Sequence, residues 1–309
     1  MLRRPVVSVG NLAMGGRGKT PVVAHLARAL LAAGLRPAIL SRGYARRQPV
    51  EGVVVVSDGA HLCADLARSG DEPLMLARDL PGAIVLVSPD RTLAATLAEQ
   101  VLGADVHVLD DGFQHRRLAR DVDVVVIAPQ DLTARRLPFG PLREDARALR
   151  RAHAVVLDGG PDAQASSVQD AIRRYTTAPV FPLHRRLGEP VPLEPGRGWP
   201  ATRPRVIAVA GIAAPERFGQ ALRAANWDVV RVMAFRDHHP YDASDVRRIA
   251  AALQDTGAAA VLTTSKDAVR LLPQRPLPMP VAAVPLGVDV GVDGEFERWL
   301  LHHVREARP

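Results

Sequence analysis

Lysine is almost absent from this chain, which makes its two lysines candidates for chemistry. The sequence has 40 basic residues that are lysine or arginine, and only Lys19 and Lys266 are lysine. A planar guanidinium does not replace a compact ammonium in a tight phosphate cradle, so a lysine kept in an arginine-rich chain is a candidate phosphate ligand. Lys19 follows a glycine-rich loop. Lys266 lies in a Thr-Thr-Ser-Lys-Asp turn whose role the sequence leaves open.

The segment from Ala13 to Thr20 has nearly the spacing of a phosphate-binding loop, with an apolar run before it and an amphipathic stretch after it. In such a loop the glycine N–H groups turn onto phosphate oxygens, Lys19 reaches the β- and γ-phosphates, and Thr20 offers a hydroxyl to Mg²⁺. Ala13 stands where the usual pattern has its first glycine, and a plain glycine turn with a surface lysine is the alternative. We predict an ATP site formed by Ala13, Met14, Gly15, Gly16, Arg17, Gly18, Lys19 and Thr20.

Carboxylates follow two of the later apolar runs. Asp110 and Asp111 come directly after the run 106–109, where a phosphate-loop enzyme places a magnesium-binding carboxylate. The alternative is an Asp-Asp-Gly turn without a metal. Asp90 follows the run 83–87 and is our first choice for the group that accepts a proton from a hydroxyl nucleophile. It would serve equally well as the N-cap of a helix that begins near Arg91.

The second half of the chain offers weaker candidates. Asp237, His238 and His239 follow an apolar run that ends at Phe235. A zinc site is not favoured, because the chain has one cysteine and no third ligand at a regular spacing. From the residues alone, a structural or solvent-exposed role for these histidines is favoured over a catalytic one.

Short apolar runs alternate with helical patterns throughout the first half of the chain. Strands are predicted at 6–9, 37–40, 53–56, 83–87, 106–109 and 122–127, with helices between most of them. This alternation predicts an α/β fold with a phosphate-binding loop and a doubly wound, mostly parallel sheet. Ligands of such sheets bind beyond the carboxyl ends of the strands. Arg42, Asp90, Asp110 and Asp111 all lie at those ends, so we expect one site at this edge.

A proline-rich segment separates two series of elements. We predict a nucleotide-binding domain at 1–182, a linker at 183–204 and a second, smaller α/β domain at 205–309, with the contacts of the terminal helix left open. The net charge of +7 and the pI near 10.5 favour acidic partners, but no segment resembles a nucleic-acid motif. Cys63 is the only cysteine, and no apolar run approaches the roughly 18 residues of a membrane span.

Several segments together resemble the tetraacyldisaccharide 4′-kinase family, the lipid A 4′-kinases of Gram-negative bacteria. The resemblance runs from about Pro5 to the end of the second domain, and its most specific segment is the one around the aspartate pair. The segments are Val9-Gly10-Asn11-Leu12, Gly15-Gly16-Arg17-Gly18-Lys19-Thr20-Pro21, Ser41-Arg42-Gly43-Tyr44, Gly70-Asp71-Glu72-Pro73, Asp110-Asp111-Gly112-Phe113-Gln114-His115-Arg116-Arg117-Leu118, Leu137-Pro138-Phe139-Gly140-Pro141-Leu142-Arg143-Glu144, Ala210-Gly211-Ile212, Asp237-His238 and Lys266-Asp267-Ala268.

The resemblance implies transfer of the ATP γ-phosphoryl group to the 4′-hydroxyl of a tetraacyldisaccharide 1-phosphate, which is a lipid A precursor. It implies that Asp90 is the base, that His238 pairs with Asp90 when the two domains close, and that Thr20, Asp110, Asp111 and Glu144 organise Mg²⁺. Arg42, Arg116 and Arg117 are expected to contact phosphate or substrate. The implied setting is peripheral, on the cytoplasmic side of the bacterial inner membrane and against its anionic surface, with no nucleic acid and no obligatory protein partner.

Two features depart from the family pattern. Only Met1 to Arg4 precede the first strand, where family members carry an apolar segment that helps to dock on the membrane. Our hypothesis is that such a segment lies upstream of residue 1, and the alternative is that the chain reaches its lipid by other means, such as an arginine-rich face that attracts anionic headgroups. Ser265 stands where an acidic residue is expected before Lys266. Two other functions remain as alternatives at this point: a phosphate-loop switch NTPase that acts with a protein partner, and a soluble small-molecule kinase.

Overall fold

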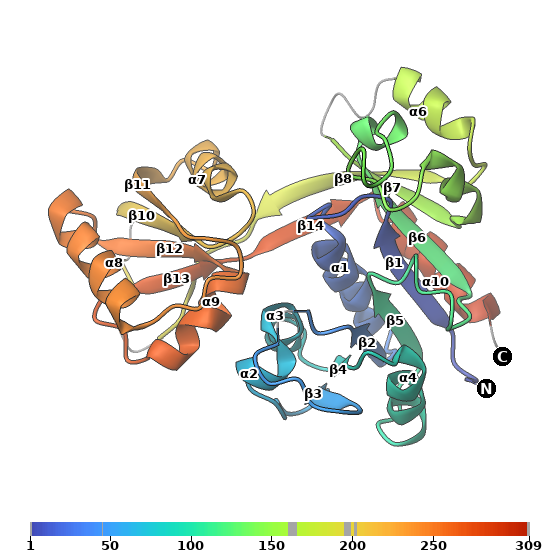
Figure 1. Ribbon diagram of the computed structural model, residues 1–309, viewed down its shortest axis with the longest axis horizontal. Helices are drawn as coiled ribbons and strands as arrows, with labels where there is room; N and C mark the ends of the chain where they lie inside the picture. Colours follow the sequence, from blue (N-terminus) through green and yellow to red (C-terminus); the bar gives the residue numbers. More distant parts are fainter. Residues whose placement is uncertain (1, 45, 160–165, 195–198, 201–202, 308–309) are drawn as a thin grey trace. The chain divides into compact units, whose positions relative to one another are not determined.

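The computed structural model describes residues 2–44, 46–159, 166–194, 199–200 and 203–307 (Figure 1). The chain forms two compact units. Unit 1 comprises Met1–Arg185 and Val288–Pro309, and unit 2 comprises Arg186–Gly287. The chain therefore passes from one unit to the other twice, once near the end of strand β8 (Val180–Leu187) and once within strand β14 (Leu286–Val290).

Unit 1 is built on a sheet whose strand order is β14-β8-β7-β6-β1-β5-β2-β4-β3. The pairs from β8 through β4 are parallel, and β3 is antiparallel to β4. The remaining strands are β1 (Val6–Asn11), β2 (Pro37–Ser41), β3 (Val54–Asp58), β4 (Ile84–Val87), β5 (Val106–Asp110), β6 (Val122–Ile127) and β7 (Ala154–Asp158). Strands such as β1 and β6 are buried along their whole length, as expected for a parallel sheet covered on both faces.

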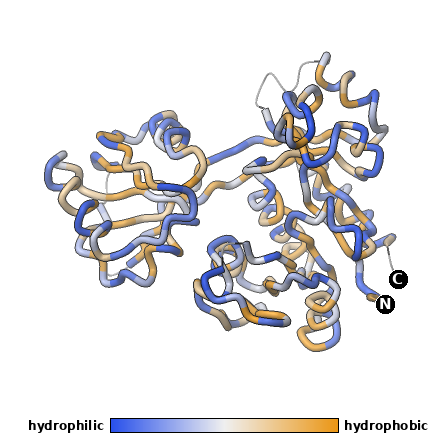
Figure 2. The backbone as a smooth tube through the Cα atoms, in the orientation of Figure 1, coloured by the Kyte–Doolittle hydropathy of each residue, from blue (hydrophilic) through white to orange (hydrophobic). Residues whose placement is uncertain are grey.

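Helices cover this sheet. They are α1 (Lys19–Ala32), α2 (Leu66–Ser69), α3 (Asp71–Asp79), α4 (Arg91–Gln100), α6 (Ser166–Arg173) and α10 (Glu295–Ala307), with 3₁₀ turns at Pro129–Leu132 and Ala146–Arg151. Apolar residues on one face of α1, among them Val23, Leu26 and Leu30, are fully buried. Hydrophobic and hydrophilic residues alternate along the helices, as one-sided burial requires (Figure 2). The predicted α/β fold with a mostly parallel, doubly wound sheet is confirmed.

Unit 2 has a second sheet, with strand order β11-β10-β12-β13-β9. Its strands are β9 (Val191–Pro192), β10 (Arg205–Ala210), β11 (Asp228–Ala234), β12 (Ala260–Thr264) and β13 (Val281–Val284). All the pairs are parallel except that of β13 with β9. Its helices are α7 (Pro215–Ala224), α8 (Ala243–Thr256) and α9 (Ser265–Leu271), followed by a 3₁₀ turn at Leu272–Gln274.

The units divide the chain differently from the domains expected from the sequence. The expected linker 183–204 holds the end of β8 and all of β9, while its residues 195–198 and 201–202 lie outside the described residues. The terminal segment belongs to unit 1, because β14 lies beside β8 in the sheet and α10 buries Phe296 against Phe181, with ring centroids 5.3 Å apart. Within the described part of the chain, no helix is both long and apolar enough to cross a membrane.

Candidate active site

The loop between β1 and α1 has the backbone that a phosphate cradle requires. Gly15 and Gly18 have φ angles of 94° and 78°, the left-handed region that glycine adopts without strain. Gly18 is the N-cap of α1, and Lys19 and Thr20 form the first turn of that helix. The N–H groups at the start of α1 and the helix dipole therefore favour an anion at this loop.

A second segment, residues 137–144, braces the loop. Met14 N–H donates to Pro141 O at 2.8 Å, and Arg143 N–H donates to Leu12 O at 2.7 Å. Ala13 forms an isolated antiparallel bridge with Leu142 and is fully buried. Such a bridge is formed by extended backbone, a conformation that does not require glycine at this position of the loop.

Lys19 belongs to a cluster of charged and amide side chains. Its Nζ lies 3.1 Å from Asn11 Oδ1 and 3.4 Å from Asp111 Oδ1. Arg143 donates two hydrogen bonds to the Asp111 carboxylate, at 2.7 and 2.9 Å, and another to Asn11 Oδ1. Burial alone would raise the pKa of Asp111, but the Arg143 hydrogen bonds and the charges of Lys19 and Arg143 outweigh it and lower that pKa. Asp111 thus stays ionised between two cations.

Asp110 lies beside this cluster, at the end of β5. Its side chain is buried, and the residue is in register with Val9 of β1. Arg91, the first residue of α4, is also buried, and its pKa is lowered by burial and by the charge of Arg42, while Asp110 and Asp111 oppose the shift. Arg42, Asp110 and Asp111, which lie at or just beyond the carboxyl ends of β2 and β5, therefore all interact with Arg91, which follows β4, and these three belong to the group expected from the sequence.

Asp90 is the N-cap of α4. Its Oδ1 accepts hydrogen bonds from Thr92 N–H at 2.9 Å and Leu93 N–H at 3.1 Å, and its own N–H donates to Ser88 Oγ at 3.1 Å. The capping role that the sequence allowed is therefore present. It also fixes the orientation of the carboxylate, which is exposed.

Glu144 forms a neighbouring group with Arg151, the last residue of the 3₁₀ turn Ala146–Arg151, and with Arg116 of the β5–β6 loop. Glu144 pairs with Arg151 at 2.9 and 3.0 Å and with Arg116 at 3.4 Å. Burial would raise the pKa of Glu144, and the hydrogen bonds and charge of Arg151 override this effect and lower it. Burial and the charges of Arg91, Arg120 and Arg117 lower the pKa of His115. Positive charge thus accumulates along this loop.

Three residues of this site were missed as site residues by the sequence analysis, although all three lie in the motifs that carried the family resemblance. Asn11 contacts both Lys19 and Arg143, and Arg143 bridges Asn11 and Asp111. Glu72, at the start of α3, accepts a hydrogen bond from Thr20 Oγ1 at 3.4 Å. Their motif positions were the only sequence signal.

His238 lies in unit 2, whereas Asp90 lies in unit 1. It follows β11 with a left-handed φ of 56°, and its N–H donates to Gly211 O at 3.2 Å and to Asp237 Oδ1 at 3.0 Å. The neighbouring His239 has a structural role: its Nε2 lies 2.7 Å from Asp245 Oδ2, and its ring packs on Phe235 and Tyr241.

Comparison with known proteins gives one consistent family. A family model described as tetraacyldisaccharide-1-P 4′-kinase matches residues 1–305. The tetraacyldisaccharide 4′-kinase of Syntrophus aciditrophicus is 37% identical over 316 residues, which cover 97% of this chain and 84% of that protein. The one from Geobacter metallireducens is 42% identical over 278 residues, covering 88% and 80%. The crystal structure of LpxK from Aquifex aeolicus in complex with ATP superimposes with a TM-score of 0.78 at 31% identity, covering 98% of this chain and 89% of that one.

Proposed function

We propose that this chain, which belongs to the tetraacyldisaccharide-1-P 4′-kinase family, transfers the γ-phosphoryl group of ATP to the 4′-hydroxyl of a tetraacyldisaccharide 1-phosphate, a lipid A precursor. The family predicted from the sequence motifs is confirmed by the match over residues 1–305. The observation that carries the proposal is the coincidence of this match with a phosphate loop whose Lys19 lies beside Asn11 and Asp111. Family membership favours the lipid kinase over a switch NTPase or a soluble small-molecule kinase.

ATP would bind along residues 13–20. The relative from Aquifex aeolicus was solved with ATP, and the loop in this chain offers the start of α1, the Lys19 ammonium and the backbone of Gly15 to Gly18. The polyphosphate would draw Lys19 and Arg143 toward its own oxygens, since both cations face this loop.

The side chains around Thr20 fit Mg²⁺, which prefers oxygen ligands and keeps several waters beside one or two carboxylates and substrate phosphates. Thr20, Asp110, Asp111 and Glu144 are proposed to organise Mg²⁺, one or two of the carboxylates directly and the rest through its waters, and Glu72 is added to this set because it contacts Thr20. Across the residues that the structure describes, no group of three or more His, Cys, Asp or Glu side chains is placed to hold a metal ion. What Mg²⁺ supplies when bound is positive charge against the β- and γ-phosphates.

Asp90 is the proposed proton acceptor, and His238 is its proposed partner from unit 2. The two N–H groups at the start of α4 hold one oxygen of Asp90, and the other oxygen is the one proposed to receive the proton of the 4′-hydroxyl. Arg42, Arg116 and Arg117 are exposed cations near this edge and are proposed to contact the phosphates or the 1-phosphorylated sugar.

The protein would reach its lipid substrate as a peripheral protein on the cytoplasmic side of the inner membrane. A hydrogen-bonded turn in unit 1, which we call the 135–139 turn, presents two exposed arginines, Arg135 and Arg136, followed by two exposed apolar side chains. Leu137 is 51% exposed and Phe139 is 82% exposed. Apolar side chains next to arginines suit the headgroup region of an anionic bilayer.

The test is transfer of labelled γ-phosphate from ATP and Mg²⁺ to the tetraacyldisaccharide 1-phosphate in detergent. Asp90→Asn is the informative variant, because asparagine caps helices about as well as aspartate but does not act as a base. We expect its rate to fall by at least about 10²-fold with little change in stability. Asp65→Asn is the matched control, since Asp65 is the exposed N-cap of α2 in the same unit and accepts from Arg68 N–H.

The outcomes separate the parts of the proposal. Product from wild type and from Asp65→Asn, with almost none from Asp90→Asn, supports both the kinase and the base. If Asp90→Asn remains fully active, the kinase stands and Asp90 loses its role. If folded, ATP-binding wild type makes no 4′-phosphorylated product, the kinase proposal fails.

A further inference from the structure

His238 depends on an unusual backbone. It is one of the few non-glycine residues with a left-handed φ, a conformation that costs free energy unless the surroundings hold it. Its N–H is shared between Asp237 Oδ1 at 3.0 Å and Gly211 O at 3.2 Å, and Gly211 is the residue that follows β10. Gly211 O is the contact that ties the His238 backbone, from which the imidazole extends, to another strand end of unit 2.

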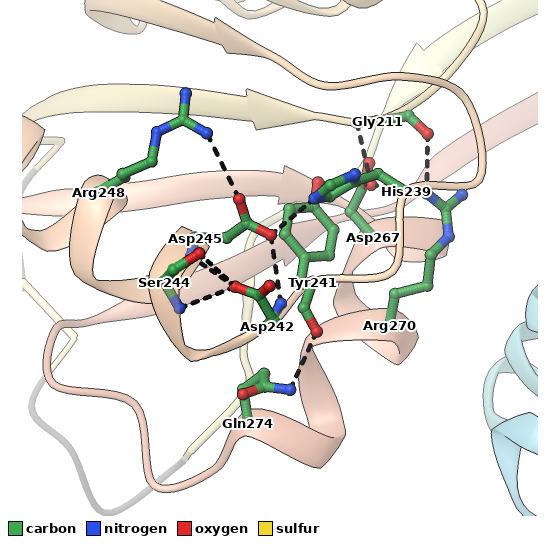
Figure 3. Close-up of polar contacts among 10 residues, drawn as sticks. All are labelled: Gly211, His239, Tyr241, Asp242, Ser244, Asp245, Arg248, Asp267, Arg270 and Gln274. Carbon is green, nitrogen blue, oxygen red and sulfur yellow. Dashed lines mark hydrogen bonds and ion pairs between the residues drawn. The ribbon is translucent and has the colours of Figure 1, made fainter.

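Gly211 is held by a buried ion pair (Figure 3). Its N–H donates to Asp267 Oδ1 at 3.0 Å, and its carbonyl accepts from Arg270 Nη1 at 2.8 Å. A Cβ atom on Gly211 would lie 3.0 Å from Asp267 Oδ1 and 3.1 Å from Arg236 O, so the backbone approaches the pair as closely as glycine allows. The same carbonyl thus receives both Arg270 and the N–H of His238.

Asp267 has more partners than an ordinary helix residue. Its Oδ1 accepts from Gly211 N–H, from the Tyr241 hydroxyl at 2.8 Å and from Arg270 Nη1 at 3.0 Å, while its Oδ2 accepts from the Thr264 hydroxyl at 2.6 Å. The Asp267 side chain is 0% exposed and that of Arg270 is 4% exposed. A buried pair of this kind often stabilises a fold no more than apolar residues of similar volume would. What it does supply is fixed hydrogen-bond geometry around Gly211.

We propose that Asp267 is a positioning residue: together with Arg270 it fixes the backbone of Gly211 and thereby holds His238 in the orientation that the reaction uses. This inference rests on the proposed role of His238. It gives the Lys266-Asp267-Ala268 segment a part in the reaction without contact with the substrate. It also predicts that the effect of Asp267 on catalysis passes entirely through His238.

A double-mutant cycle tests this dependence, with kcat measured in the phosphoryl-transfer assay below the midpoint of unfolding of every variant. We expect Asp267→Asn to lower kcat about tenfold and to leave the KM for ATP within about twofold, because the ATP loop belongs to unit 1. In a His238→Ala background, Asp267→Asn should change kcat by less than about twofold. A merely structural role of Asp267 would lower kcat by the same factor in both backgrounds.

Asp245→Asn is the matched control. Asp245 is also buried and also pairs with an arginine three residues later (Arg248), but its other partners are the ring of His239 and the backbone of Asp242, rather than Gly211, which links Asp267 to His238. Its kcat should stay within about twofold of wild type even if its stability falls. If Asp267→Asn does not fold, Arg270→Lys replaces it in the cycle, since lysine keeps the charge but not the two bonds from Nη1.

Each result has one reading. If His238→Ala keeps full activity, the proposed role of His238 fails and the positioning inference falls with it. If His238→Ala is impaired while folded Asp267→Asn or Arg270→Lys is not, only the positioning inference is overturned. Equal losses in both His238 backgrounds overturn it as well.

Discussion

Two aspartate–arginine pairs, one in each unit, illustrate two uses of the same chemistry. In unit 1 Asp111 binds Arg143 and Lys19, and its side chain is 41% exposed. In unit 2 Asp267 binds Arg270, two hydroxyls and a backbone N–H, and its side chain is 0% exposed. In the first pair, a carboxylate at the edge of a sheet is contacted by two long cationic side chains. The second holds the backbone of a loop from inside the unit.

The difference indicates what each pair is able to do. Solvent reaches the Asp111 carboxylate, which is 41% exposed, so losing the contacts with Lys19 and Arg143 to a polyphosphate would not leave this carboxylate without hydrogen-bond partners. Asp267 and Arg270 cannot separate without leaving a charge buried and unpaired, which is expensive. The charges of unit 1 are therefore the ones proposed to rearrange around a substrate, whereas those of unit 2 are proposed to keep a loop in one shape.

The largest effect expected from this comparison is on the free energy of unfolding. Asp267→Asn leaves Arg270 buried opposite a neutral amide, so we expect it to lower the free energy of unfolding by about 3–5 kcal/mol. Asp111→Asn should cost less than about 1 kcal/mol, because its partners are partly solvated and asparagine tolerates the left-handed φ of 57° at this position. Thermal or urea unfolding of the two isosteric variants measures both values.

Equal losses in the two variants would contradict the comparison. Activity provides the complementary control, since Asp111→Asn is expected to impair phosphoryl transfer while remaining nearly as stable as wild type. A variant that is stable and fully active at position 111 would remove Asp111 from the proposed magnesium site.

Local sequence patterns were enough to predict the strands of unit 1 and the group of charged residues at their carboxyl ends. Long apolar runs such as those of β1 and β6 are typical of parallel strands buried on both faces, and strand ends of one sheet gather at one edge. This is why Arg42, Asp110 and Asp111 could be grouped from the sequence.

Contacts between segments that are far apart in the chain could not be predicted from local sequence patterns. Arg143 reaches Asn11 across 132 positions, and nothing in its own segment separates it from the neighbouring Glu144, which was the one predicted. The return of β14 and α10 to unit 1 is also non-local, since β14 lies beside β8 about a hundred positions earlier in the chain. The role proposed for Asp267 could not be predicted for another reason. Polar residues at the start of a helix are usually explained by capping, and in α9 the N-cap is Thr264, with Asp267 in the first turn.

A second comparison is between the 135–139 turn of unit 1, which is proposed to contact the membrane, and exposed apolar residues elsewhere in the same unit. Replacing both Leu137 and Phe139 by serine should weaken binding to vesicles that contain anionic lipid by about tenfold, because interfacial burial of these side chains contributes on the order of 1–2 kcal/mol. Co-sedimentation with anionic and with purely zwitterionic vesicles measures the effect. We expect wild type to bind the anionic vesicles more tightly than the zwitterionic ones. Equal binding to both would contradict the proposed role of the arginines in this turn.

Val101→Ser is the matched control for this experiment. Val101 is 69% exposed and lies in the same unit, at the C-cap of α4, outside the 135–139 turn. Its replacement should leave vesicle binding unchanged. A loss equal to that of the Leu137 and Phe139 double variant would mean that exposed apolar area in general, and not this turn, governs binding.

The smallest expected effect is the dependence of stability on pH around Asp111. Because the pKa of Asp111 is lowered in the folded chain, its ionised form contributes stability that is complete above the unfolded pKa of about 4 and is lost as the pH falls through the folded value. Wild type should therefore lose slightly more thermal stability than Asp111→Asn between pH 5 and pH 3, by about 1 °C, since solvent screens a half-exposed pair. Scanning calorimetry at several pH values measures this gap, and added salt should narrow it. If the difference in thermal stability between wild type and Asp111→Asn stays constant from pH 7 to pH 3, the Asp111–Arg143 pair does not favour the ionised carboxylate. The contrast between an exchangeable pair and a buried one would then lose its electrostatic basis.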